Sequence, residues 1–138
     1  MSAEPSIEAH FSRLPSGADP AQRTRIVREY LAAVHVHLEA LHRGGASGSH
    51  VNGAHSDLMD RLVRRLFESA EEGFLAAGGE QLSSLCVVAV GGYARREMSV
   101  HSDVDLLFLH RDEITPPVAE VAQRVQYWLW DASLAVGA

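Results

Sequence analysis

Two short apolar runs, separated by a pair of glycines and a charged segment, constrain the fold of this chain more than any other feature. Residues 83–90 are apolar and rich in β-branched side chains, which predicts a strand covered on both faces. Residues 103–109 form a second run of this kind, with two aspartates near its start. Gly91 and Gly92 directly follow the first run. The stretch therefore predicts a strand, a glycine turn, a short connection and a second strand.

The regions on either side of the two strands show helical patterns. Residues 19–42 begin with an aspartate that can cap a helix and a proline suited to its first turn, and their apolar side chains recur at intervals of three and four. A second helix is predicted to begin at residue 56 or 57 and to end at the glycines 78–79. The Gly- and Ser-rich residues 43–56 are predicted to form a loop. A third helix is predicted to begin at Thr115-Pro116.

This order of elements predicts an α/β (α+β) fold in which N-terminal helices pack on an incomplete mixed sheet. Because two strands alone are marginal as a sheet, we expect the core to be truncated at its C-terminal end, lacking at least one strand. We divide the chain into an N-terminal segment at residues 1–20, which we expect to be partly ordered, a helical region at residues 21–80, and a core at residues 81–138.

Composition narrows the range of functions. A formal net charge of −6 argues against binding to nucleic acid, because proteins that neutralise many phosphates usually present a basic face. All twelve basic residues are arginine, which excludes chemistry that needs a lysine. The one cysteine, Cys86, lies in an apolar run and is expected to pack in the core. The first residues show no leader pattern and no apolar run approaches the length of a membrane span, so we expect a cytoplasmic protein without a membrane partner.

Two aspartates carry the strongest chemical signal. Asp103 and Asp105 lie two apart in a predicted strand, so their side chains project from the same face, about 6.5 Å apart along the backbone. Carboxylates are preferred ligands for Mg²⁺, although an isolated pair of this kind is more often only the turn before a strand. Gly91 and Gly92 favour a site, because glycine after a strand lets backbone N–H groups approach an anion. Together these residues predict a phosphate and metal site.

The same residues resemble a known signature. Gly-Gly, a spacer and then Asp-x-Asp in a strand is the pattern of the DNA polymerase β-like nucleotidyltransferases. The segment GGYARREMSVHSDVDLLFL is similar to the GGYGRRE…SDIDLLFL segment of the bacterial PII uridylyltransferases, and SDLMDRLVRRLFESA resembles the helix before their first strand. The last residues, YWLWDASLAVGA, resemble their LWDxxLxVGH segment. The resemblance spans about residues 25–138 and implies a partial polymerase β-like nucleotidyltransferase fold.

The resemblance also implies roles for individual residues. Gly91 and Gly92 would hold a nucleoside triphosphate, with Ser102 near the phosphates. Asp103 and Asp105 would be the catalytic residues and would bind two Mg²⁺ ions, with Mn²⁺ as an alternative. An acceptor hydroxyl would then attack the α-phosphate in line, and pyrophosphate would leave.

The two arginines after the glycines have two possible roles. Arg95 and Arg96 are implied to bind nucleotide phosphate oxygens, and the alternative is that they pair with Glu97 or are solvated. The chain departs from the family pattern at Ala94, where the family usually has glycine. No residue after the second predicted strand is expected to supply the third carboxylate that these enzymes use.

The implied reaction is transfer of UMP from UTP to a tyrosine of the PII nitrogen-regulatory protein. Whether the nucleotide donor is UTP or ATP stays open. Two other interpretations also stay open: a fragment that binds nucleotide or PII without catalysis, and a protein adenylyltransferase of the glutamine synthetase adenylyltransferase type.

Overall fold

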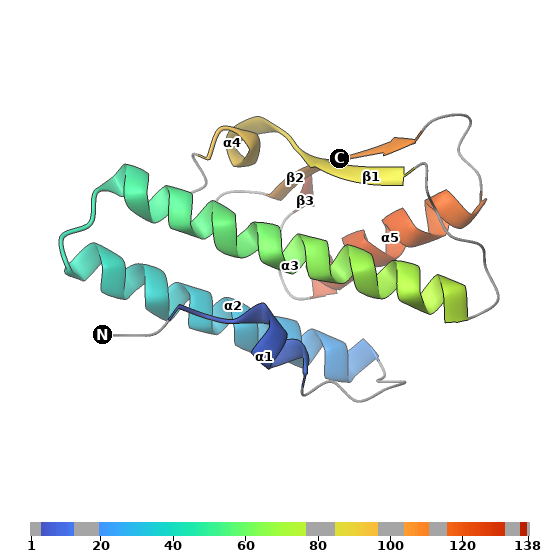
Figure 1. The fold of residues 1–138 in the computed structure, drawn as a ribbon, viewed down its shortest axis with the longest axis horizontal. Coiled ribbons are helices and arrows are strands. Elements are labelled where there is room, and N and C mark those ends of the chain that lie inside the picture. Colours follow the sequence, from blue (N-terminus) through green and yellow to red (C-terminus); the bar gives the residue numbers. More distant parts are fainter. Residues whose placement is uncertain are drawn as a thin grey trace.

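The fold is a helical hairpin that supports a small sheet. The computed structural model describes residues 4–12, 20–76, 85–96, 104–110, 116–131 and 136–137. Figure 1 shows α2 and α3 as long antiparallel neighbours, with the strands on the side of α3 away from α2. The elements in chain order are α1 (Ile7–Phe11), α2 (Pro20–Arg43), α3 (Gly48–Ala76), β1 (Leu85–Ala89), α4 (Gly91–Ala94), β2 (Val104–His110), α5 (Pro116–Asp131) and β3 (Val136–Gly137).

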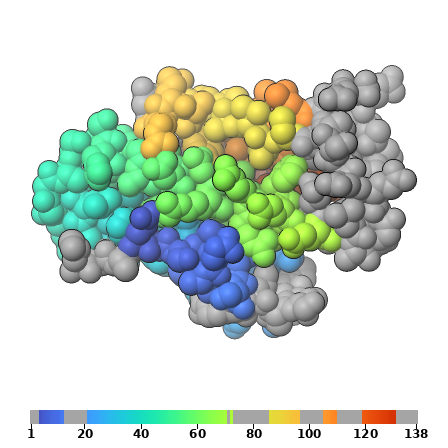
Figure 2. Space-filling model, viewed as in Figure 1, coloured from blue at the N-terminus to red at the C-terminus, as the bar shows by residue number. Residues whose placement is uncertain are grey.

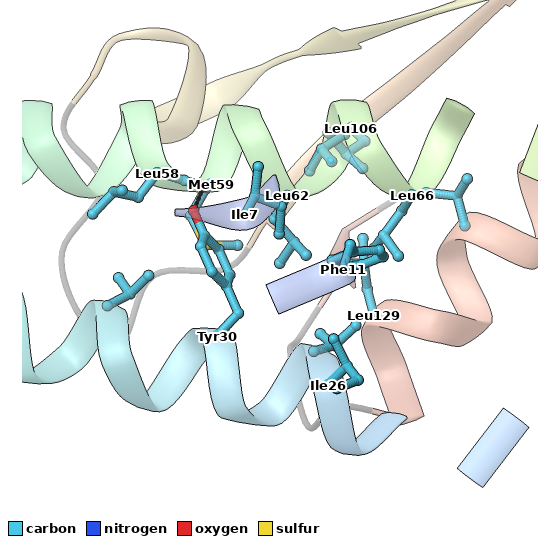
Figure 3. Packing of buried hydrophobic residues seen from close by; sticks show 14 of the residues in the cluster. Ile7, Phe11, Ile26, Tyr30, Leu58, Met59, Leu62, Leu66, Leu106 and Leu129 are labelled. Carbon is cyan, nitrogen blue, oxygen red and sulfur yellow. Dashed lines mark hydrogen bonds between the residues drawn. The ribbon is translucent and has the colours of Figure 1, made fainter. Parts of the chain in front are cut away.

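Apolar stripes on α2 and α3 form the centre of the core. On each helix the buried residues recur at intervals of three and four, which places them on one face. Tyr30 of α2 reaches α3, where its hydroxyl donates a hydrogen bond of 2.6 Å to the carbonyl oxygen of Leu58 (Figure 3). Burial of each large apolar side chain stabilises the fold by about 1.5–3 kcal/mol. Fully buried large side chains of the described residues include Val27, Tyr30, Val34, Leu38, Leu58, Met59, Leu62, Leu66, Val121, Val125 and Leu129.

The connection between α2 and α3 is much shorter than the sequence predicts. Residues 43–56 were expected to form a loop, but α3 already begins at Gly48. Ser47 caps this helix: its Oγ accepts a hydrogen bond of 3.0 Å from the backbone N–H of His50. Gly45, with φ +93°, makes the turn that precedes it. The prediction was wrong because the Gly and Ser content favours a loop locally, whereas side chains such as Ser56 are buried against the core.

The other helices agree with the sequence more closely. Both α2 and α5 begin at the prolines predicted for their first turns, Pro20 and Pro116. The helix α1 was not predicted. The Oγ of Ser6 caps it by accepting a hydrogen bond from the backbone N–H of Ala9, and its Ile7 and Phe11 side chains are buried in the core. The predicted end of the second helix, at residues 78–79, lies outside the described residues.

The sheet is mixed, as expected. β1 pairs antiparallel with β2, and β2 pairs parallel with β3 through Val104↔Val136 and Asp105↔Gly137. The chain order of the strands is also their order in the sheet. β3 was not predicted, because a strand of two residues has no periodic pattern.

One face of the sheet packs on the helices and the other is open. Leu106 of β2 is buried on the inner face, with Val87 and Phe108 packed beside it. On the outer face Leu107 is 45% exposed and Leu109 is 46% exposed. The expectation that both faces are covered was therefore wrong.

Cys86 also lies at the surface, so its predicted place in the core was wrong. It precedes the inward-facing Val87, and successive side chains of a strand point to opposite faces of the sheet.

Within the described ranges, no helix is both long enough and apolar enough to cross a membrane.

The cap of α3 gives a testable prediction. Ser47→Ala should lower the free energy of unfolding by about 0.5–2 kcal/mol, because the first turn of α3 loses a hydrogen-bond acceptor. Urea denaturation followed by circular dichroism measures this change. Ser49→Ala, at an exposed position inside the helix, is the matched control and should change stability much less. Equal stability of the two variants would contradict the assignment of Ser47 as the cap.

Candidate functional site

The glycine turn begins where β1 ends. Gly91 starts the one-turn helix α4 and has a φ of +63°, a left-handed conformation that glycine adopts without steric cost. Just before it, the backbone N–H of Val90 donates a hydrogen bond of 3.0 Å to the carbonyl oxygen of Asp105. This bond continues the β1–β2 ladder by one residue, so the start of the turn is fixed against β2.

Asp105 directs its carboxylate at the glycine turn. A β-carbon added to Gly91 would lie 2.8 Å from Oδ2 of Asp105, closer than side chains normally tolerate. Glycine at position 91 therefore leaves space that the carboxylate uses. Asp105 is only partly buried and precedes the inward-facing Leu106, so it lies on the open face of the sheet. The structure thus places Gly91 and Asp105, which the sequence assigned to one site, close together.

Asp103, the other aspartate of the predicted pair, lies outside the described residues, as does Ser102. Of the two proposed metal ligands, only Asp105 can therefore be placed. Among the residues that the structure describes, no three histidine, cysteine or acidic side chains gather in a way that could hold a metal ion. The carboxylate of Asp105, next to space that a β-carbon would fill, fits one ligand of a magnesium site. The metal-binding roles of Asp103 and Asp105 stay predictions.

Tyr93 is a residue of the turn to which sequence reasoning gave no role. Its side chain is buried, and its hydroxyl donates a hydrogen bond of 2.6 Å to Oδ1 of Asp60 in α3. Burial, together with this bond, raises the pKa of Tyr93 above the ordinary tyrosine value. Burial also raises the pKa of Tyr30 above the ordinary tyrosine value. The available signal was an aromatic residue directly after the glycines in an otherwise polar stretch.

The two arginines of the turn differ in their surroundings. Arg96 contacts α3: its Nη1 lies 2.8 Å from Oδ1 of Asp57, and its Nη2 donates a hydrogen bond of 3.0 Å to the carbonyl oxygen of Gly53. The bond from Arg96 lowers the pKa of Asp57. Arg95 is exposed, and its Nη2 would lie 3.9 Å from a β-carbon on Gly92. Neither role considered from the sequence included a contact between Arg96 and α3.

Ala94 does not strain the turn. It is the last residue of α4, it is exposed, and its backbone N–H donates to the carbonyl oxygen of Val90. The one described residue other than glycine with positive φ is Arg96, at +59°. The alanine that departs from the family pattern is therefore accommodated in an ordinary helical conformation.

Residues 32–135 match the family described as "Putative nucleotidyltransferase DUF294". The chain belongs to this family. The matched range of this DUF294 nucleotidyltransferase includes the glycine turn, β2 and Asp105. No solved structure matches the chain.

Several curated relatives carry the name bifunctional uridylyltransferase/uridylyl-removing enzyme. The one from Rhodospirillum rubrum is 42% identical over 95 residues, which cover 66% of this chain and 10% of the relative. The one from Erythrobacter litoralis is 37% identical over 93 residues, 67% of this chain and 10% of the relative. The one from Caulobacter vibrioides is 32% identical over 132 residues, 88% of this chain and 13% of the relative. The DUF294 chain thus spans about a tenth of the length of these relatives.

The contact between Gly91 and Asp105 can be tested by Gly91→Ala. The substitution places a side chain at positive φ, which costs about 1–2 kcal/mol, and pushes its methyl group against the Asp105 carboxylate. Gly45→Ala is the matched control, because Gly45 also has positive φ but nothing lies within 4 Å of its added β-carbon. Urea denaturation should show similar losses of stability for both. Only Gly91→Ala should shift the NMR carboxyl signal of Asp105, and an unchanged signal would contradict the contact.

The raised tyrosine pKa values predict weaker folding in alkali. Above about pH 10 the unfolded chain releases the protons of Tyr30 and Tyr93 while the folded chain retains them. The free energy of unfolding should therefore fall by about 1.4 kcal/mol per pH unit for each tyrosine above pH 10, and both contributions are fully present below it. Urea denaturation across this range should show a shallower decline for Tyr30→Phe and for Tyr93→Phe. The Tyr30→Phe/Tyr93→Phe double variant should lose both contributions, and a decline as steep as that of the wild type would contradict the prediction.

Proposed function

We propose that this chain contributes the nucleotide-binding turn and metal-binding strand of a uridylyltransferase that modifies a PII-type signalling protein. The observation that carries the proposal is the approach of the Asp105 carboxylate to Gly91, at the end of a strand in a nucleotidyltransferase family member. A glycine turn that exposes backbone N–H groups beside a carboxylate suits a triphosphate together with a divalent cation.

Each residue has a distinct role in this proposal. The backbone N–H groups of Gly91 and Gly92 bind phosphate oxygens, because no β-carbon prevents their approach. Asp103 and Asp105 hold Mg²⁺, or Mn²⁺ in its place, which when bound neutralises charge on the phosphates. Ser102 lies near the same phosphates.

Arg95 and Arg96 have different proposed roles. Arg96 binds α3 through both of its terminal nitrogens. Arg95 is exposed and its guanidinium lies near Gly92, and we propose that it contacts the nucleotide phosphates. Arginine suits this role because its planar guanidinium can donate two parallel hydrogen bonds to a phosphate.

The proposed reaction transfers UMP from UTP to a tyrosine of PII. The tyrosine oxygen attacks the α-phosphorus and forms a new P–O bond, the bond to pyrophosphate breaks, and the tyrosine proton passes to solvent. The uridylyl group is supported by the names of the relatives and by the resemblance of residues 91–109 to the PII uridylyltransferases.

The proposal predicts metal-linked nucleotide binding that depends on the aspartates. Calorimetric titration of UTP in Mg²⁺ should show binding to wild type and at least tenfold weaker binding to Asp105→Asn and to the Asp103→Asn/Asp105→Asn double variant, since the cation loses its ligands. Repeating the titration with ATP and with Mn²⁺ tests base and metal preference.

Glu120→Gln is the control for loss of one carboxylate, since Glu120 forms an exposed ion pair with Arg124 in α5. It should bind UTP as wild type does. Equal affinity of the wild type and the double variant would count against the site. Transfer of radiolabelled UMP to a purified PII-type protein distinguishes an enzyme from a module that only binds nucleotide.

A further inference from the structure

One face of α3 carries three groups that contact the glycine turn. Gly53, Asp57 and Asp60 are spaced by four and three residues, so they lie on a single stripe of the helix. This stripe contacts Tyr93 and Arg96, which follow the two glycines. Figure 2 shows the turn lying against the N-terminal half of α3.

The contact between Tyr93 and Asp60 joins the turn to the core. Tyr93 belongs to the same buried cluster as Leu62 of α3 and Leu106 of β2. Its 2.6 Å bond to Asp60 is a charge-assisted bond to a carboxylate, which is stronger than a bond between neutral groups. The ring and its hydroxyl together fix the distance between the turn and α3.

The contacts of Arg96 fix the other end of the turn. Its φ of +59° is uncommon for a residue other than glycine and persists only where surrounding contacts hold it. Asp57 and the carbonyl oxygen of Gly53 supply such contacts. A β-carbon on Gly53 would lie 3.4 Å from Nη2 of Arg96, so the absence of a side chain there eases the approach.

Gly91 and Gly92 are therefore held from two sides. On one side Val90 is bonded to the backbone of Asp105, and on the other Tyr93 and Arg96 are bonded to α3. The ion pair of Arg96 is exposed, and exposed pairs contribute little to stability. Its consequence is geometric: it sets where the turn lies relative to the carboxylate of Asp105.

We infer that Asp57 and Asp60 are positioning residues, which act through Arg96 and Tyr93 to hold the glycine turn in the geometry that binds the nucleotide phosphates. This inference rests on the proposed function for its ligand. Neither carboxylate contacts Asp105 or the glycines themselves in the described contacts, so neither is a catalytic residue.

The structure provides a matched pair of tyrosines to test the inference. Tyr30→Phe and Tyr93→Phe each remove a buried hydroxyl that donates a 2.6 Å bond to α3, but only Tyr93 lies in the turn. Calorimetry should show about tenfold weaker binding of UTP with Mg²⁺ for Tyr93→Phe and less than a twofold change for Tyr30→Phe. Equal weakening by both would mean that lost stability alone explains the effect, and would overturn the inference.

Variants of the two aspartates extend the test. Asp60→Ala should weaken UTP binding as Tyr93→Phe does, whereas Asp60→Asn should restore most of it because the amide oxygen can still accept the tyrosine hydroxyl. Asp57→Ala should weaken binding about threefold. Glu120→Ala removes an exposed ion pair elsewhere and should have no effect. If Asp57→Ala binds UTP as tightly as Glu120→Ala does, Asp57 is not a positioning residue.

A readout without ligand separates this inference from the proposed function. The backbone N–H groups of Ala94, Arg95 and Arg96 bond within the turn, so their hydrogen exchange reports its opening. NMR should show about tenfold faster exchange at these amides in Tyr93→Phe and Asp60→Ala, and wild-type rates in Tyr30→Phe. If wild type fails to bind UTP but this exchange pattern is found, the proposed function fails while the attachment to α3 stands. Unchanged exchange in both variants would overturn the attachment.

Discussion

The packing of α2 against α3 supports every other part of the structure. A sheet with one short antiparallel ladder and a two-residue third strand is marginal by itself, and it needs an apolar layer beneath it. The buried face of α3, with α2 packed behind it, provides that layer, and α5 adds Val121, Val125 and Leu129 to it. The position of the glycine turn is thus determined first by helix packing and only then by the strands.

The helix α3 has two roles because different faces of it meet different neighbours. One face contributes Leu58, Leu62 and Leu66 to the core, while the polar stripe with Asp57 and Asp60 meets the turn. Because α3 contacts both the core and the turn, the packing of the core determines where the turn lies. This arrangement explains how the turn can hold Gly91 beside the carboxylate of Asp105.

Sequence reasoning succeeded where the signal was local. The apolar runs of β1 and β2, the prolines that begin α2 and α5, and the glycine turn after β1 can all be recognised from neighbouring residues. It failed where contacts between residues distant in the sequence determine the structure. The first turns of α3 have a composition typical of loops, and the bond between Tyr93 and Asp60 joins residues 33 apart in the sequence, for which no periodic pattern exists. The open outer face of the sheet was missed because both strands are apolar on each side.

That open face has a practical consequence through Cys86. It is the single cysteine of the chain, and its thiol is exposed on β1, the strand that leads into the glycine turn. A maleimide fluorophore or a spin label would therefore attach at one known position without further mutagenesis, and would report on the strand from there. Purification without a reducing agent would for the same reason allow two molecules to join through a disulfide bond.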